Sequence, residues 1–260
     1  MQMGKDLVYE VIGRMALLTI NREKKRNAIT QEMITNFLEY LDRAERNNDV
    51  RALCLTGAGE KAFCAGADLA GSLSAEDSGY LSGAERYAEL LKRFSKFPKP
   101  MVARVNGPCL AGGIGLMLSC DIVIARNDTF FSTPEVNVGI FPMMVGALLK
   151  QNVTRKKAME MVLTGRRVSA EEAEKMGLIT RAVEPECLDE EVQKTLKFLI
   201  ANSPTGIRMG KEAFRVMGEL PFDDAVDYLC KALAKVTSTE DAKEGMTAFL
   251  EKRPPDFKGK

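Results

Sequence analysis

A glycine-rich turn in the middle of the chain could hold an anionic oxygen. Residues 105–116 read VNGPCLAGGIGL, with Gly112 and Gly113 directly before an apolar run. Glycine lets a ligand approach backbone N–H groups closely, and a helix that begins after this pair would direct its free N–H groups and positive dipole end at the ligand. This arrangement suits an oxyanion hole, in which backbone donors stabilise a carbonyl oxygen that gains charge. Because glycine pairs are common, spacing alone favours the simpler alternative, a tight strand-to-helix turn with no ligand.

A second loop of small residues could supply another backbone donor. Residues 62–69 read AFCAGADL, so alanines flank Gly66 on both sides. Small side chains permit a close approach to the backbone, although alanine–glycine loops also serve packing alone. Because each loop follows a candidate strand, the two loops together predict a site with two backbone donors.

Glu135 is the acid best placed to work beside these donors. Pro134 fixes the chain directly before it, and apolar residues follow at positions 136, 138, 140 and 141. A carboxyl group near apolar walls can have a raised pKa and can then exchange protons near neutral pH. A solvated loop glutamate is the more common arrangement, and it stays open as the alternative.

The chain contains no histidine, and this limits the side chains that could carry out catalysis or bind a metal. It excludes Ser-His and Cys-His nucleophilic systems and imidazole metal sites, so proton transfer must use Asp, Glu, Lys, Tyr, Cys or water. The six cysteines are widely spaced and form no CxxC pair, so no metal site is predicted. The net charge of +1 gives no global field that would favour nucleic acid or a membrane, although local charge could bind an anionic ligand.

The length and the N-terminal residues indicate how many domains to expect and in which compartment the protein works. The 260 residues allow one or two domains, and a hydrophobic content of 45% is enough for a substantial core. The first six residues, MQMGKD, lack the apolar run of a signal peptide. No stretch of about 18 apolar residues could span a membrane. We therefore expect a protein of the reducing cytoplasm.

Strands and helices that alternate along the chain would position these loops. Residues 9–20 predict a hairpin with its turn at residues 13–14, and Thr30 predicts the N-cap of a helix that faces a core. Later candidates are strands at 52–56, 101–105, 122–125 and 179–183, helices at 84–97 and 116–119, and a helix with a capping box at 169–172 that ends at Gly177. From about residue 188 only helical patterns remain. The chain is thus predicted to be an α/β core over residues 1–198 followed by a helical region over residues 199–260.

Taken in order, these pieces resemble the enoyl-CoA hydratase/isomerase (crotonase) superfamily over essentially the whole chain. Besides the two loops and the Pro-Glu turn, the matching pieces are Asn21-Arg22 with Asn27-Ala28, Cys120-Asp121, Gly139, residues 163–166 (LTGR) with Ala170 and Ala173, Gly177-Leu178, residues 244–246 (EGM) and residues 249–253 (FLEKR). Each piece alone is modest, but their order and spacing together are highly specific.

The resemblance implies a spiral of ββα units with a helical C-terminal region used for trimerisation. The partners would be further copies of the chain, in a homotrimer or a dimer of trimers. The substrate would be a thioester of coenzyme A, with no permanently bound cofactor. The backbone N–H groups of Ala67 and Gly112 would hold the thioester oxygen.

Other positions that match the family would contact coenzyme A. Basic residues near the first helix tend to meet its phosphates in such folds, although a charge run can also be merely solvated. The implied contact residues are Lys24, Lys25, Arg26, Ala65 along the adenine, Asp68, Leu69, and Phe249 and Lys258 from a neighbouring subunit.

The chain departs from the resemblance at Gly115. Hydratases of the family usually hold and split one water with two glutamates. Glu135 matches the second glutamate, but the position of the first is Gly115, which has no side chain. A single acid suits double-bond isomerisation, because Glu135 could take a proton at one carbon and return it at another. In having glycine at this position, the chain also resembles hydratase-like members of the family that act on branched or dicarboxylic acyl-CoAs.

We therefore expect an enoyl-CoA hydratase with a backbone oxyanion hole and a single glutamate. The alternatives are an enoyl-CoA isomerase and a non-catalytic acyl-CoA binder, since fold alone does not fix function. The acyl pocket is predicted to draw on residues 80–87 and 141–145. Residues at helical spacing in the C-terminal region predict a helix that packs on the core or on a neighbour: Ala225, Leu229, Leu233 and Val236.

Overall fold

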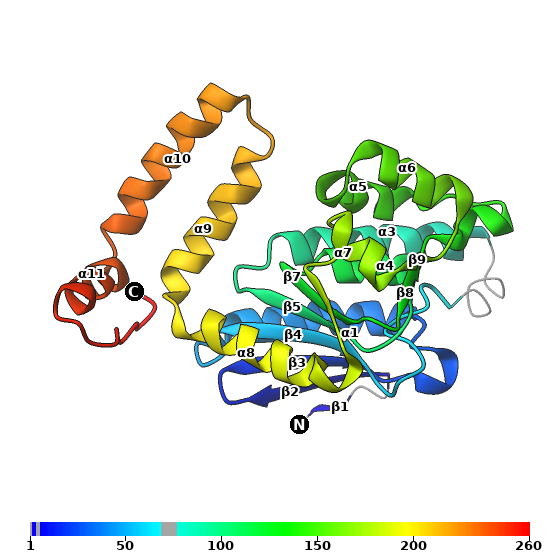
Figure 1. Cartoon of the computed structure of the whole chain (residues 1–260), viewed down its shortest axis with the longest axis horizontal. Coiled ribbons are helices and arrows are strands. Elements are labelled where there is room, and N and C mark those ends of the chain that lie inside the picture. Colours follow the sequence, from blue (N-terminus) through cyan, green and yellow to red (C-terminus); the bar gives the residue numbers. More distant parts are fainter. Residues whose placement is uncertain (1, 4–5, 69–76) are drawn as a thin grey trace.

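The computed structural model of the chain describes residues 2–3, 6–68 and 77–260, and the side chains of residues 6–68 and 82–260. Within this part of the chain a seven-stranded sheet has the order β1-β2-β3-β4-β5-β7-β10 (Figure 1). Its strands are β1 (Gln2–Met3), β2 (Leu7–Ile12), β3 (Met15–Ile20), β4 (Ala52–Gly57), β5 (Met101–Val105), β7 (Ile122–Arg126) and β10 (Arg181–Val183). The first three are antiparallel, and β3 to β10 are parallel neighbours.

The predicted hairpin and the first helix are confirmed. Strands β2 and β3 pair antiparallel across a turn in which Gly13 has a φ of 58°. Helix α1 (Gln31–Arg46) begins at its N-cap Thr30, whose hydroxyl accepts a hydrogen bond of 3.1 Å from the N–H of Met33. Its apolar stripe, with Phe37 among the buried residues, faces the core as the spacing predicted.

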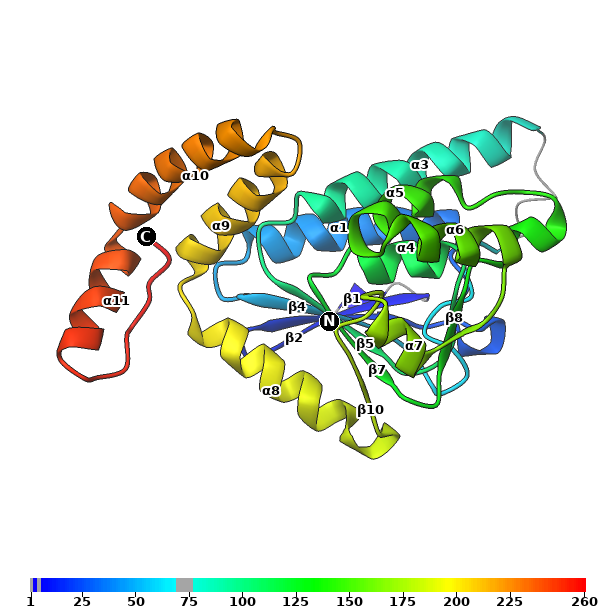
Figure 2. The same ribbon diagram turned by 45° about the horizontal axis from the view of Figure 1, so that its top comes forward.

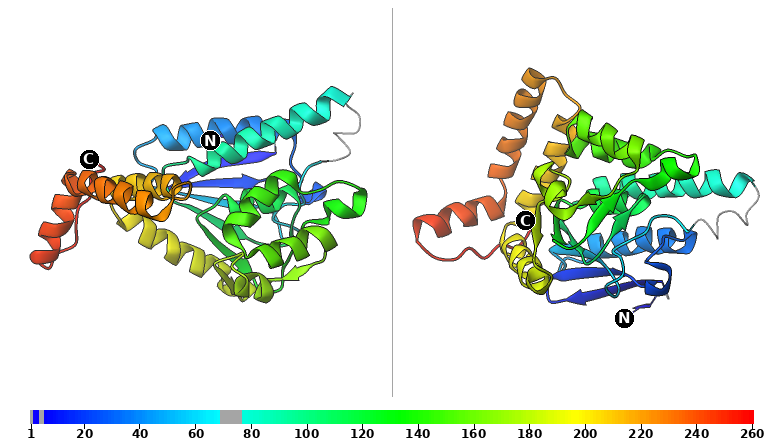
Figure 3. Two further views of the ribbon diagram at one scale, coloured as in Figure 1. Left: turned by 90° about the horizontal axis from the view of Figure 1, so that it is seen from above. Right: turned by 45° about the vertical axis from the view of Figure 1, so that its right-hand side comes forward.

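Helices cover both faces of the large sheet. Helices α1 and α3 (Asp77–Ser95) pack side by side on one face, and α8 (Leu188–Ala201) lies on the other (Figure 3). Alternate residues of β4 serve the two layers: Leu53 and Leu55 join the main core, whereas Ala52 and Cys54 join a smaller core with α8. The predicted boundary between the α/β core and the helical region, at residue 198, falls inside α8, and this division of the chain stays a prediction.

A smaller sheet and short helices carry the glycine-rich turn and the Pro-Glu turn. The sheet has the order β6 (Cys109–Leu110), β8 (Phe130–Ser132) and β9 (Val168–Ser169). The helices are α4 (Gly112–Leu118), α5 (Met143–Asn152), α6 (Arg155–Thr164) and α7 (Ala170–Lys175), with the 3-10 turn η2 (Pro134–Val138). The N-cap predicted before α7 is confirmed, because the Ser169 hydroxyl accepts from the Glu172 N–H at 3.2 Å.

The C-terminal helices extend away from the sheet. Helices α9 (Pro204–Met217), α10 (Phe222–Thr237) and α11 (Glu240–Leu250) form an arm beside the core (Figures 1 and 2). Helix α10 packs on α9 and α11 and has no fully buried residue. Of its predicted packing residues, Ala225, Leu229 and Val236 are half-buried, whereas Leu233 is 62% exposed.

Candidate active site

The loop that contains Ala67 runs beside residues 26–29, where Ala67 forms a parallel β-bridge with Ile29. The N–H of Ala65 donates to the Arg26 carbonyl at 3.0 Å, and the N–H of Ile29 donates to the Gly66 carbonyl at 2.8 Å. The N–H of Asp68 then donates back to Ile29 at 2.9 Å. Successive N–H groups of an extended chain point to opposite sides, so the Ala67 N–H points away from this ladder. No backbone hydrogen bond between described residues uses it as donor.

The second predicted donor lies at the start of α4. Gly112 is the first residue of this helix, so its N–H has no acceptor within the helix. The apolar pattern placed a short helix at residues 116–119, which is too late, whereas the oxyanion-hole interpretation expected a helix just after Gly112 and Gly113, which is close to the observed start. The glycine pair forms the first helical turn because Ala111 before it takes an unusual conformation, with φ 50° and ψ −127°.

The two loops are in direct contact, and glycine makes the contact possible. A Cβ at Gly66 would lie 3.1 Å from the Gly112 nitrogen and 2.7 Å from the Ala111 Cβ. A Cβ at Gly113 would lie only 2.6 Å from the carbonyl oxygen of Cys64. The fold therefore brings together the two loops that carry the predicted oxyanion donors.

The Pro-Glu turn leaves the small sheet at the same edge as the glycine-rich turn. Strands β6 and β8 are parallel neighbours, with Leu110 opposite Ser132, and the Ala111 N–H donates to the Ser132 carbonyl at 2.9 Å. Gly112 lies two residues after the end of β6, and Glu135 lies three residues after the end of β8. Paired parallel strands end at one edge, so the acid and the helix start lie on one side of the site.

Glu135 has the properties of a group that transfers protons. It is half-buried, and its Oε2 atom is buried without a hydrogen-bond partner among the described residues. Burial raises the pKa of the Glu135 carboxyl, and a backbone hydrogen bond within the same residue opposes this shift in part. A carboxylate with one unpaired oxygen and a raised pKa can take and return protons at an adjacent substrate atom.

The space beside Gly115 is occupied by an aromatic side chain, Tyr87, which the sequence analysis included only as part of the predicted acyl-pocket segment 80–87. A Cβ at Gly115 would overlap the hydroxyl of Tyr87, and it would lie 3.4 Å from the Cγ2 atom of Val145. Tyr87 comes from α3 and is 8% exposed, and its hydroxyl donates to the Gly112 carbonyl at 2.5 Å. Burial raises the pKa of Tyr87, and the charge of Glu135 raises it further. Tyr87 therefore contacts the start of α4 through its hydrogen bond to Gly112, and it also interacts electrostatically with Glu135.

The predicted coenzyme A contacts fall into two places. Lys24, Lys25 and Arg26 are exposed, at the 3-10 turn η1 (Glu23–Lys25) and directly after it. The Arg26 carbonyl accepts the hydrogen bond from Ala65, so the basic turn lies beside the loop predicted to meet the adenine. These three cations are exposed and form no ion pair with a carboxylate of the described residues, so they remain candidates for phosphate binding.

Asp68 has a role in the fold that the sequence did not reveal. Its carboxylate pairs with Arg22 at 3.0 Å, and Arg22 also pairs with Asp6 at 2.9 Å. This ion-pair network fixes the loop that carries Ala67 to the segment before η1. Leu69, the remaining predicted contact of this loop, lies outside the described residues.

The two predicted contacts from a neighbouring subunit lie on the C-terminal arm. Phe249 is 82% exposed at the end of α11. The Lys258 N–H donates to Asp241 at 2.9 Å, and its Nζ pairs with Asp256 at 2.5 Å. The tail is thus tied to α11, and the side chain of Phe249 is free to contact another surface.

An apolar hollow lies next to the Pro-Glu turn. It is lined by Val136, Gly139, Ile140, Phe141 and Met143. Phe141 and Met143 belong to the predicted acyl-pocket segment, whereas Val145 of that segment is buried against Gly115. In the other predicted segment, the side chain of Tyr80 lies outside the described part of the chain, and Tyr87 is buried.

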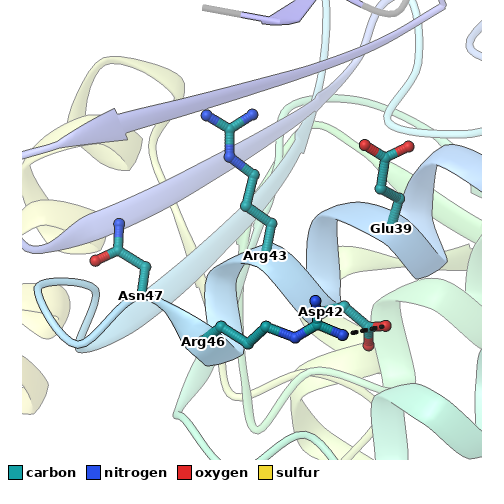
Figure 4. A pocket seen from close by; sticks show the side chains of 5 residues that line it. All are labelled: Glu39, Asp42, Arg43, Arg46 and Asn47. Atoms are coloured by element: carbon teal, nitrogen blue, oxygen red, sulfur yellow. Dashed lines mark ion pairs between the residues drawn. The ribbon is translucent and has the colours of Figure 1, made fainter.

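A second hollow lies on the outer side of α1 and offers no comparable chemistry (Figure 4). It is lined by Glu39, Asp42, Arg43, Arg46 and Asn47. Asp42 in this hollow pairs with Arg46 at 3.8 Å and with Arg93 at 2.9 Å. The guanidinium of Arg43 lies 4.9 Å from the centre of the Tyr9 ring. Among the described residues, no cluster of acidic and sulfur side chains could hold a metal ion, and no helix is long and apolar enough to cross a bilayer.

The α/β fold brings the two glycine loops into contact, next to the strand that leads into the Pro-Glu turn. The sequence matches the enoyl-CoA hydratase/isomerase family over residues 11–260. The chain belongs to this family, and its fold is that of the crotonase superfamily.

Individual relatives agree over nearly the whole length. The chain is 33% identical to the short-chain-enoyl-CoA hydratase of Clostridium acetobutylicum, with 95% of each protein covered. It is 32% identical to the (E)-benzylidenesuccinyl-CoA hydratase of Thauera aromatica, with 96% of this chain and 98% of that protein covered. The crystal structure of an enoyl-CoA hydratase from Mycobacterium smegmatis superposes with a TM-score of 0.93 at 33% identity, over 98% of this chain and 99% of that one.

Proposed function

We propose that this protein adds water reversibly to the double bond of a 2-enoyl-CoA thioester. The observation that carries the proposal is the contact between the Ala67 loop and the start of α4, beside a carboxylate with an unpaired buried oxygen. The N–H groups of Ala67 and Gly112 stabilise the negative charge that develops on the thioester oxygen. Glu135 takes a proton from water as the hydroxyl adds to C3, and it returns a proton to C2.

Isomerisation is the second candidate, because Gly115 supplies no carboxylate and Glu135 is the acid that the sequence assigns to the site. An isomerase needs only to move one proton between two carbons under the same oxyanion hole. The purified protein should be incubated separately with crotonyl-CoA, a methyl-branched 2-enoyl-CoA, a dicarboxylic 2-enoyl-CoA and a 3-enoyl-CoA. Mass spectrometry then separates the two reactions, because hydration adds about 18 Da by stoichiometry and isomerisation adds nothing. An absence of water addition to every 2-enoyl-CoA would overturn the proposal.

The basic turn is proposed to bind the phosphates of coenzyme A. Replacing Lys24, Lys25 and Arg26 together with glutamine should raise the KM for an enoyl-CoA by about 10-fold, since each exposed charge contributes up to about 1 kcal/mol. The kcat should stay nearly constant, because these residues do not touch the reacting carbons. The matched control is the corresponding enoyl-pantetheine thioester, which lacks the nucleotide phosphates. If the KM values of both thioesters rise equally, the turn acts on the fold and does not bind phosphate.

The C-terminal arm is proposed to be the trimerisation surface. Phe222, Leu233 and Phe249 are 81%, 62% and 82% exposed on α10 and α11, and side chains of this kind are stabilised when a partner covers them. Sedimentation of the purified protein at micromolar concentration should show a trimer or a dimer of trimers. Leu233→Asp should shift this species toward the monomer while Lys231→Asp, an exposed position on the same helix, should not. A stable wild-type monomer would exclude a site shared between subunits.

A further inference from the structure

We propose that Tyr87 replaces the missing first glutamate: its hydroxyl oxygen accepts one hydrogen of the water that Glu135 activates. The inference rests on the proposed hydration. It assigns a second water-binding group to a site in which the sequence shows a single acid.

The position of Tyr87 supports this assignment first. A side chain at residue 115 would begin at a Cβ that overlaps the Tyr87 hydroxyl oxygen and lies 3.3 Å from its ring carbon Cζ. The hydroxyl and any side chain at position 115 therefore compete for one space. Gly115 and Tyr87 therefore form a matched pair, in which the absence of a side chain at position 115 leaves room for the tyrosine hydroxyl from α3.

The orientation of the hydroxyl determines what it can do in this space. Its hydrogen is donated to the Gly112 carbonyl at 2.5 Å. A phenolic hydroxyl has one hydrogen and two acceptor lone pairs, so toward the site the oxygen can only accept. A raised pKa keeps the phenol neutral, and the causes are burial first, then Cys64, Cys109 and Glu135.

A water molecule that adds to C3 needs two acceptors for its hydrogens. When both hydrogens are directed to protein oxygens, a lone pair of the water faces the substrate carbon. One acceptor is the unpaired carboxylate oxygen of Glu135 and the other is the Tyr87 hydroxyl oxygen. The contact of Tyr87 with the Gly112 carbonyl places this second acceptor beside the helix start that binds the thioester oxygen.

The step balances without any further reactant. One O–H bond of the water breaks and its proton passes to Glu135 while the C3–O bond forms. The electrons of the C2–C3 double bond move onto the thioester oxygen, which the N–H groups of Ala67 and Gly112 stabilise. Glu135 then delivers the proton to C2 and returns to its ionised state. Tyr87 keeps its own proton throughout.

The test variant is Tyr87→Phe, which removes the oxygen and keeps the ring. The kcat of hydration should fall by about 10- to 100-fold, because a hydrogen bond to the reacting water is lost, whereas the KM should stay nearly constant. A second readout is exchange of the C2 protons of butyryl-CoA in D2O, which needs Glu135 and the oxyanion hole but no water addition. This exchange should persist. Tyr9→Phe is the control, because the Tyr9 hydroxyl is also buried but has no hydrogen-bond partner among the described residues.

A rescue variant keeps the test decisive if the phenylalanine alters the packing. Tyr87→Ala should lose hydration, and the combined change Tyr87→Ala with Gly115→Glu should recover part of it, because the carboxylate can then occupy the vacated space. Gly115→Glu alone should be inactive because of the overlap with Tyr87.

The possible failures are distinguishable from one another. A wild type that adds water to no enoyl-CoA overturns both this inference and the proposed function. A wild type that hydrates, together with a Tyr87→Phe variant that hydrates equally fast, overturns the inference alone. An equal loss of hydration and C2 proton exchange also overturns it, because Tyr87 would then only support Gly112.

Discussion

Glu135→Gln is expected to abolish turnover while leaving the fold and thioester binding intact. Glutamine keeps the size and polarity of the side chain but cannot take a proton, and general acid–base groups contribute about 10²- to 10⁴-fold to rate. The hydration rate should fall by this factor. Isothermal titration with butyryl-CoA, which has no double bond to hydrate, should give an unchanged Kd.

The pH dependence of the wild type should report the same group. Burial raises the pKa of Glu135 above its ordinary value of 4.5. Because the carboxylate must be ionised to accept a proton from water, kcat/KM should fall as the pH drops through this raised pKa. The acidic limb of the profile should therefore lie above the range of a solvated glutamate.

The stability of the variant follows from the sign of the same shift. The folded-state pKa is higher than the unfolded one, so the fold favours the protonated carboxyl. That contribution is fully present below the unfolded pKa and is lost as the pH rises through the folded pKa. At pH 7 the charge is a cost, so Glu135→Gln should melt no lower than the wild type.

The control for these measurements is Glu186→Gln, a change at an exposed glutamate in the 3-10 turn η3 (Pro185–Cys187). It should leave turnover, the pH profile and the melting temperature unchanged. A Glu135→Gln variant with wild-type turnover would show that another group carries the proton. If the wild type turns over no acyl-CoA and this change alters only binding, the chain is an acyl-CoA binder.

Local sequence patterns predicted the elements whose stability is local. The helix after Thr30 needs only its cap and an apolar stripe, and the hairpin needs only its turn and β-rich flanks. Both were located correctly for that reason. The apolar pattern placed this helix only at residues 116–119, because glycine is a poor helix former, and the conformation of Ala111 before the observed start has no signature in the sequence.

Contacts between distant residues limited what could be predicted of the site. Tyr87 and Gly115 are 28 positions apart, and neither residue alone indicates that one fills the space beside the other. The ion pair of Arg22 with Asp68 spans 46 positions and depends on how the two loops pack. The resemblance to the family indicated candidates for the two backbone donors and for the acid, because those positions lie within continuous motifs. It could not reveal a compensating residue from a different helix.

Gly113→Ala should have the second large effect, through the contact between the two loops. The added Cβ would lie 2.6 Å from the Cys64 carbonyl oxygen and 3.1 Å from its carbonyl carbon. These are backbone atoms, and the same oxygen accepts from the Leu110 N–H at 2.9 Å, so the loop cannot give way without breaking that bond. The loops must separate, and the N–H groups of Ala67 and Gly112 would no longer converge on one oxygen. Loss of one oxyanion donor costs about 10²- to 10³-fold in kcat.

Measurements on Gly113→Ala distinguish the loss of the oxyanion donors from the loss of the Tyr87 hydroxyl. Hydration and the exchange of C2 protons of butyryl-CoA should both fall, because both require the charged thioester oxygen to be stabilised. The free energy of unfolding should drop by about 1–3 kcal/mol from overpacking. Gly146→Ala in α5 is the control, since a Cβ there meets open space and alanine favours a helix by about 0.5–1 kcal/mol. A folded Gly113→Ala variant that keeps wild-type exchange would show that the thioester oxygen is bound elsewhere.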